Sequence, residues 1–219
     1  MESQVSEKKS RAEDLSSLFD LESEFSVISG DDLKRFQGFT EQNNVPGCVV
    51  LIAAFATLVF RYKNEQQYLI RVQLGKTFLQ DESEIFDFKL RHDLSMSELI
   101  AYVYATVKKS RRWRRLTNHS NEFMPFFCGI VSEEQDQPFS MSASFESSVS
   151  NSIIINNIGY DQKCVPGCWH DHITVLIKDL CDNPSTGISL LRMLSEREME
   201  KLRSWSVSLV DQQISNPST

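Results

Sequence analysis

The chain has 219 residues, of which 41% are hydrophobic and 24% charged, and its formal net charge is −7. These proportions are typical of a globular protein, and the acidic balance argues against a general nucleic-acid binder. Five cysteines, an odd number, follow a polar beginning, "MESQVSEKKSRAEDLSS", in which no secretory signal is visible. The longest apolar run, residues 48–60, is too short to span a bilayer. We therefore expect a reduced, cytoplasmic protein that does not enter a membrane.

Composition divides the chain into one domain with two polar ends. Residues 1–24 are charged and serine-rich and are expected to be flexible, residues 25–207 to form the domain, and residues 208–219 to be a linker-like tail. The first segment also allows a short amphipathic helix, which would either pack on the domain or serve as a docking peptide. Its apolar residues are Leu15, Leu18, Phe19 and Leu21.

The first half of the domain has the pattern of two helices followed by two strands. A Ser/Asp start before Leu33, Phe36 and Phe39 predicts the first helix. The apolar stretch from about Gly47 to Tyr62 predicts a second helix that is covered on several sides. Segments 66–74 and 84–90 have the β-branched content and the alternation of strands.

Two Ser-x-x-Glu patterns predict capping boxes at the N-termini of two later helices. Ser95 and Glu98 open the segment "SMSELIAYVYATVKKS", and Ser195 and Glu198 open the last helix. The expected buried stripe of the first of these helices is Ile100, Val103, Tyr104 and Val107, and the expected hydrophobic staple of the second is Leu194 with Met199.

Three more strands are predicted between these helices, in "FMPFFCGIV", "FSMSASFE" and "SIIINNIGY", and a further helix from about Cys168. The order is then helix, helix, strand, strand, helix, three strands, helix, helix. This order predicts an α/β layered domain rather than an all-helical or all-β one.

Segment 164–184, "CVPGCWHDHITVLIKDLCDNP", concentrates residue types that bind zinc. Two residues along a helix turn through about 200°, so His170 and His172 would point to nearly opposite sides. Cys164, Cys168 and His172 could still share an ion, but no general base is evident beside them. We favour a helix start after a Pro-Gly turn, because one apolar face forms from Trp169, Ile173, Leu176, Ile177 and Leu180.

The segment "WHDHITVLIKDLCDNPSTGISLLRMLSEREMEKLRSW" resembles the end of the condensation domains of nonribosomal peptide synthetases. "VPGCVVLIAAFATLVFRYKNEQQYLI" and "LRHDLSMSELIAYVYATVKK" are similar to earlier parts of the same family, so the resemblance covers about residues 25–207. The matching positions in the last segment are His172, Asn183, Pro184, Ile188, Ser189, Leu194, Ser195, Glu198 and Trp205.

The departures from the family pattern decide what this resemblance implies. A condensation domain has two lobes of the chloramphenicol-acetyltransferase type, and a His-His-x-x-x-Asp-Gly motif on the first lobe supplies the histidine that assists amine attack on a thioester. None of this chain's four histidines is followed four residues later by aspartate. The resemblance therefore implies the C-terminal lobe only, a mixed β-sheet flanked by helices, without the catalytic motif.

A basic cluster stands out in the acidic chain, around Trp113. Its charges favour either the C-terminus of a helix followed by a solvated loop, or an anion-binding patch that docks an acidic, phosphorylated carrier protein. RNA binding is disfavoured by the overall charge. The candidate partner-binding residues are Lys108, Lys109, Arg111, Arg112, Trp113, Arg114 and Arg115.

Three functional hypotheses follow. The first is a non-catalytic platform that recruits an adenylation domain, a carrier protein or a tailoring enzyme of a peptide synthetase; it has no cofactor of its own, although a carrier partner would bear phosphopantetheine. The second is an acyltransferase whose cleft is completed by a partner or a second copy, and the third is a metal-binding regulator. The second hypothesis predicts that activity requires one of the four histidines, which are His92, His119, His170 and His172.

Cys48 and Cys128 are expected to be core residues.

Overall fold

The structure, a computed structural model, describes residues 25–74, 83–110, 126–130, 141–147, 152–160 and 169–204. The predicted flexible segment, residues 1–24, and the predicted tail, residues 208–219, lie outside this part, as do residues 205–207 of the predicted domain. The elements in chain order are β1 (Phe25–Ile28), α2 (Gly30–Gln42), α3 (Gly47–Lys63), β2 (Gln67–Leu74), β3 (Ser83–Lys89), α4 (Met96–Lys108), β4 (Phe126–Ile130), β5 (Met141–Ser147), β6 (Ile153–Tyr160) and α6 (Trp169–Asp182). Residues 196–204 form a last helix.

The described strands form one six-stranded sheet in the order β1-β6-β5-β4-β2-β3. The α/β class with flanking helices is confirmed. The sheet is not a mixture of parallel and antiparallel pairs, however, because all of these described pairings are antiparallel. Three of them join strands that follow one another in the chain, which favours the antiparallel direction.

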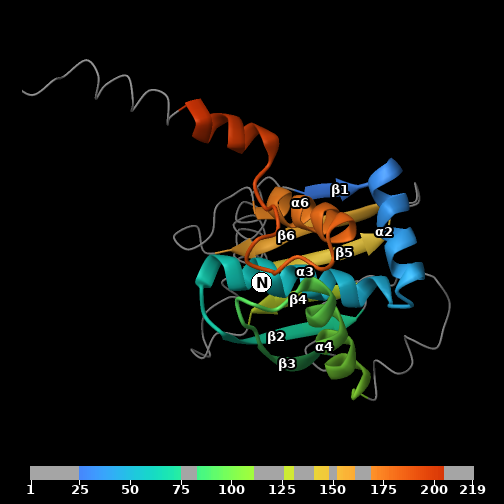
Figure 1. Cartoon of the computed structure of the whole chain (residues 1–219). Helices are drawn as coiled ribbons and strands as arrows, with labels where there is room; N and C mark the ends of the chain where they lie inside the picture. The colour runs from blue at the N-terminus through green and yellow to red at the C-terminus, as the bar shows by residue number, and fades with distance from the viewer. Residues whose placement is uncertain are drawn as a thin grey trace, which may run out of the picture.

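Helices α3, α4 and α6 lie over one face of the sheet (Figure 1). Alternate residues of the strands are buried toward them: Ile70 and Val72 on β2, and Phe86 and Phe88 on β3. Their neighbours Leu69 and Ile85 point to the other face, and they are 37% and 50% exposed, respectively. The core therefore lies between the sheet and this helical layer.

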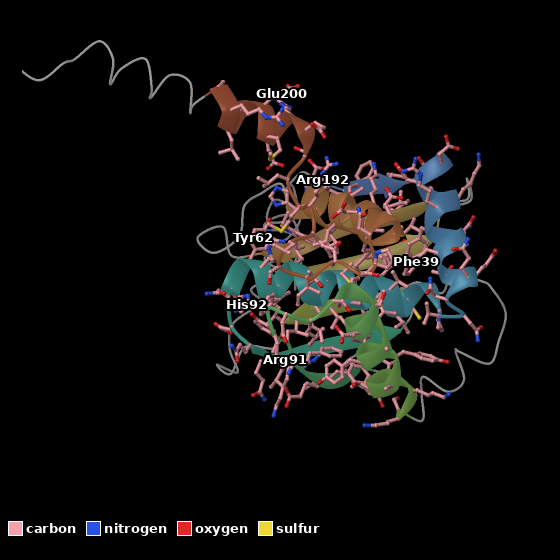
Figure 2. The ribbon with its side chains drawn as sticks, viewed as in Figure 1. Phe39, Tyr62, Arg91, His92, Arg192 and Glu200 are labelled. Carbon is pink, nitrogen blue, oxygen red and sulfur yellow. The ribbon has the colours of Figure 1, made fainter. Side chains whose placement is uncertain are left out.

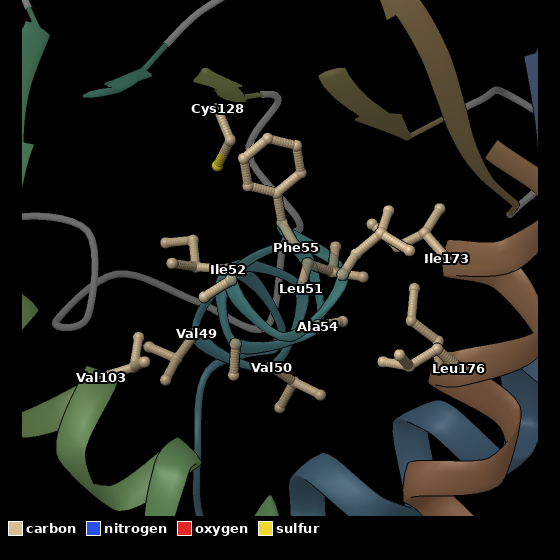
Figure 3. Close-up of a cluster of buried hydrophobic side chains, with 14 of the residues drawn as sticks. Val49, Val50, Leu51, Ile52, Ala54, Phe55, Val103, Cys128, Ile173 and Leu176 are labelled. Atoms are coloured by element: carbon tan, nitrogen blue, oxygen red, sulfur yellow. The ribbon is translucent and has the colours of Figure 1, made fainter. Parts of the chain in front are cut away.

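Helix α3 runs through the centre of the core, as its apolar sequence predicts. Each residue from Val49 to Phe60 is at most 1% exposed, and Figure 3 shows several of these side chains between α4, α6 and the strand that carries Cys128. Thr57, its one buried polar residue, donates its hydroxyl hydrogen bond to the carbonyl of Ala53 at 2.9 Å. The helix ends where Asn64 adopts the left-handed conformation, with φ of 54°.

Within the described residues, no single helix combines the length and apolar character that crossing a bilayer requires. The helices α2 and α3 meet those criteria only when taken together, and they are bent by 108° at their junction.

Most predicted elements are confirmed within a few residues of their expected bounds. The Ser95–Glu98 capping box of α4 forms in full, and Ile100, Val103 and Val107 of the expected stripe are buried while Tyr104 is half-buried. Ser29 precedes α2 as expected, but its side chain makes no capping hydrogen bond. Strand β1 was not predicted, because it is short and buries Ser26 while exposing Phe25.

Residues 183–195, which we call the strap, return from α6 across the ends of α3 and α4. The backbone N–H of Ile188 donates to the carbonyl of Leu94 at 2.9 Å, and that of Met96 donates to Thr186 at 3.1 Å. The Arg61 guanidinium donates to the carbonyls of Leu191 and Ile188. The strap is thus bound to the core on both sides before the last helix begins.

Candidate functional site

The predicted basic cluster begins at the C-terminus of α4. Lys108 and Lys109 are both exposed there, and the Lys108 ammonium lies 5.4 Å from the centre of the Tyr104 ring. This is a cation–π distance and agrees with a solvated helix end. The rest of the predicted cluster lies outside the described residues: Arg111, Arg112, Trp113, Arg114 and Arg115. Partner binding by this cluster stays a prediction.

Of the three residues considered as zinc ligands, the structure describes only His172. Cys164 and Cys168 lie outside the described part, and among the described residues no group of three or more His, Cys, Asp or Glu side chains is placed to hold a metal ion. Both ring nitrogens of His172 contact protein groups instead, Nδ1 the Tyr62 hydroxyl and Nε2 the Glu198 carboxylate. A metal could bind His172 only by displacing one of these partners.

Tyr62, His172 and Glu198 form a hydrogen-bonded chain across three elements. Tyr62 lies in the last turn of α3 (Figure 2), His172 belongs to α6, and Glu198 belongs to the last helix. Nε2 of His172 lies 2.7 Å from Oε1 of Glu198. A neutral imidazole satisfies both contacts when Nε2–H donates to the carboxylate and Nδ1 accepts from the tyrosine hydroxyl.

The carboxylate of Glu198 is also the capping group of the last helix. Its Oε2 accepts from the backbone N–H of Ser195 at 2.8 Å and from the Ser195 hydroxyl at 2.7 Å. The second predicted capping box is therefore confirmed. The sequence pattern identifies the bond to Ser195, but no local signal indicates that the other oxygen of Glu198 reaches His172, because that contact spans 26 positions.

His170 points to the opposite side of α6, as the helical geometry predicts, and it is also buried at 8% exposure. Its backbone carbonyl accepts from the Ser26 hydroxyl of β1 at 3.0 Å and from Thr174 at 3.0 Å. The Nε2 atom of its ring lies 3.6 Å from a carboxylate oxygen of Asp171. Both histidines of α6 are therefore internal.

His92 is the one histidine among the described residues whose side chain lies on the surface. Its ring packs against Phe60 with a centroid distance of 4.8 Å, and its Nδ1 lies 3.2 Å from the Ser189 hydroxyl oxygen of the strap. The hydroxyl proton of Ser189 is donated to the carbonyl of His92 at 3.1 Å. These two contacts fasten the strap to the residues that precede α4.

The described thiols are unsuited to nucleophilic attack. Burial raises the pKa of the Cys48 thiol to about 12 and that of the Cys181 thiol to about 12. Burial also raises the pKa of Cys128, which is fully enclosed beneath the sheet. A thiol with such a pKa is protonated near neutral pH, and only the thiolate is a nucleophile. The prediction that Cys128 is a core residue is confirmed, whereas Cys48 is half-buried and packs against the edge of the core.

No protein-family model matches the chain, and no curated protein matches it. Several solved structures do. The first condensation domain of the calcium-dependent antibiotic synthetase, in complex with a substrate analogue, matches 78% of this chain with 48% of its own, at a TM-score of 0.53 and 9% identity. The X-domain in the complex of the X-domain and OxyB from teicoplanin biosynthesis matches 80% of this chain with 48% of its own length, at a TM-score of 0.54 and 13% identity.

A larger protein with the same likeness is AB3403, a four-domain nonribosomal peptide synthetase, which matches 81% of this chain with 18% of its own at a TM-score of 0.54 and 8% identity. At such identities the likeness shows the fold. The chain has a condensation-domain-like α/β fold and spans about half the length of the condensation and X domains that it matches.

Proposed function

We propose that the chain is a non-catalytic, partial condensation-like domain of a nonribosomal peptide synthetase system, corresponding to the C-terminal lobe. It acts as a platform that recruits an adenylation domain, a carrier protein or a tailoring enzyme. The observation that carries this proposal is the coverage: the chain matches 48% of a condensation domain's length and its sequence contains no His-His-x-x-x-Asp-Gly motif.

The environments of the described histidines support a non-catalytic role. General base catalysis needs a titratable group within hydrogen-bond reach of the reacting atom. His172 has both nitrogens in contact with protein groups, and His170 is buried on the other side of the same helix. The histidine of the family motif has no counterpart in the sequence, so this chain can bind a partner but lacks the group that assists bond formation.

The teicoplanin X-domain supports recruitment as the role. That domain has the same fold and forms a complex with OxyB. A condensation-like domain can thus serve as a binding surface for another protein. For this chain we propose the basic cluster from Lys108 to Arg115 as that surface, because guanidinium groups suit acidic, phosphorylated partners.

A binding experiment tests this proposal with a phosphopantetheine-bearing carrier protein and an adenylation domain of a peptide synthetase as separate probes. Charge reversal at four arginines of the cluster should weaken binding to one probe by about tenfold or more, equivalent to about 1.4 kcal/mol. A matched control reverses four exposed cations elsewhere, Lys34, Lys89, Arg91 and Lys201. Equal affinity of the cluster variant and the unmodified chain would remove the cluster from the proposal. The reversed residues are Arg111, Arg112, Arg114 and Arg115.

The alternative is an acyltransferase whose cleft is completed by a partner or a second copy. The exposed position of His92 favours it, since this is the described histidine that another chain could reach. It predicts turnover of a carrier-bound acyl thioester with an amine acceptor, lost in His92→Ala. Absence of turnover by the unmodified chain, alone and with the probes above, contradicts the alternative and agrees with the platform.

A further inference from the structure

The last helix (196–204) differs from the other described helices because it projects away from the sheet and the helical layer (Figure 1). Of its nine residues only Glu198 and Met199 are partly buried, and the others are exposed. Glu200 lies on the projecting part (Figure 2). A helix with so little burial cannot owe its direction to core packing, so specific side-chain contacts set its position.

Beyond the capping box with Ser195, two side-chain contacts join this helix to earlier residues within the described part of the chain. Arg192 and Glu196 lie 2.7 Å apart, but their side chains are 62% and 73% exposed, and such surface ion pairs contribute little. The second contact joins Glu198 to His172, whose side chain is 4% exposed. His172 continues the chain of contacts to Tyr62 of α3.

We propose that Tyr62, His172 and Glu198 form a tie that sets the direction of the last helix, and that Ser195 is the hinge about which the helix turns when the tie opens. This inference is independent of the proposed function. The proposal rests on the two oxygens of the Glu198 carboxylate, which have different partners. Oε2 of Glu198 caps the helix through Ser195, and Oε1 holds the helix to His172.

Because the two oxygens have separate partners, opening the tie leaves the capping box intact. The helix then remains helical while its direction becomes free. The strap does not follow, since Ile188 and Leu191 are buried and bonded to the loop before α4 and to Arg61. The tie therefore determines where the described end of the helix, at residue 204, lies relative to the domain.

The test measures the distance between spin labels placed at Lys34 of α2 and at Glu200, introduced through ketone-bearing residues so that the native cysteines are untouched. The unmodified protein should give one narrow distribution. His172→Ala should lose it and give a broad distribution, while hydrogen exchange of amides 199–204 remains as protected as in the unmodified protein. Tyr62→Phe, which keeps the ring and removes only the hydroxyl, should broaden the distribution to a smaller extent.

His170→Ala is the matched control, since His170 is a buried histidine of the same helix whose ring lies beside Asp171 and not beside Glu198. It should destabilise the domain in a similar way without changing the distance distribution. Two results would overturn the proposal. One is a narrow distribution in both His172→Ala and Tyr62→Phe. The other is equal broadening in His170→Ala and His172→Ala, which would mean that any loss of packing in α6 releases the helix.

Discussion

Helix α3 and the last helix are stabilised in opposite ways. In α3 every residue from Val49 to Phe60 is at most 1% exposed, and neither its N-cap residue nor an acidic first turn supports its start. In the last helix almost every residue is exposed, and a complete capping box marks its start. One helix depends on tertiary burial, and the other on local hydrogen bonds and one tie.

The largest expected effect comes from removing a core side chain of α3. Phe55 is fully buried among α6 and the strands (Figure 3), and Phe55→Ala should lower the free energy of unfolding by about 3–5 kcal/mol, through lost transfer energy and a cavity. Urea denaturation followed by circular dichroism measures it. A loss below about 1 kcal/mol would mean that the core around α3 closes over the cavity.

Removal of each capping box in turn should distinguish a helix that contributes to global stability from one that unfolds locally. Ser95→Ala removes the N-cap of α4, whose first turn buries Met96 and Leu99 and is bonded to the strap, and should cost about 1 kcal/mol of global stability. Ser195→Ala should change the free energy of global unfolding by no more than about 0.5 kcal/mol, but it should speed amide exchange in the last helix. Equal global losses in the two variants would show that the last helix unfolds together with the core.

The pH dependence of α4 should sharpen the same comparison. Hydrogen bonds from the Ser95 side chain and backbone hold the pKa of Glu98 below its ordinary value of 4.5. A carboxyl group whose pKa is lower in the folded state stabilises that state above its unfolded pKa, and loses this contribution as pH falls through the folded pKa. Between about pH 6 and about pH 3, the free energy of unfolding should therefore fall more for the unmodified chain than for Glu98→Gln, as measured by denaturation at the two pH values. Parallel falls would contradict the role of this carboxylate.

The smallest effect is expected on the last helix itself. Leu202 is 47% exposed, so Leu202→Ala should change the free energy of unfolding by no more than about 0.5 kcal/mol. The same denaturation experiment compares it with Phe55→Ala. A loss of more than about 2 kcal/mol would show that the last helix is part of the cooperatively folded core.

The features that were predicted correctly are those whose causes lie within a few residues of one another. Each capping box joins residues three positions apart, and the ends of the apolar face of α6, Trp169 and Leu180, are eleven positions apart. The burial of α3 also follows from its sequence, because a helix that is apolar nearly all round must be covered. Strand β1 was missed, since a four-residue strand with one buried serine carries no strong alternation.

The sequence by itself determined the α/β class, the bounds of most elements and the two helix starts, because propensity, periodicity and capping act over one or two helical turns. Only the tertiary structure decided the antiparallel order of the sheet and the partners of the histidines. The bond from His172 to Tyr62 joins residues 110 positions apart, and the bond from Ser189 to His92 joins residues 97 apart. Such contacts depend on how the layers pack, and no local pattern specifies them.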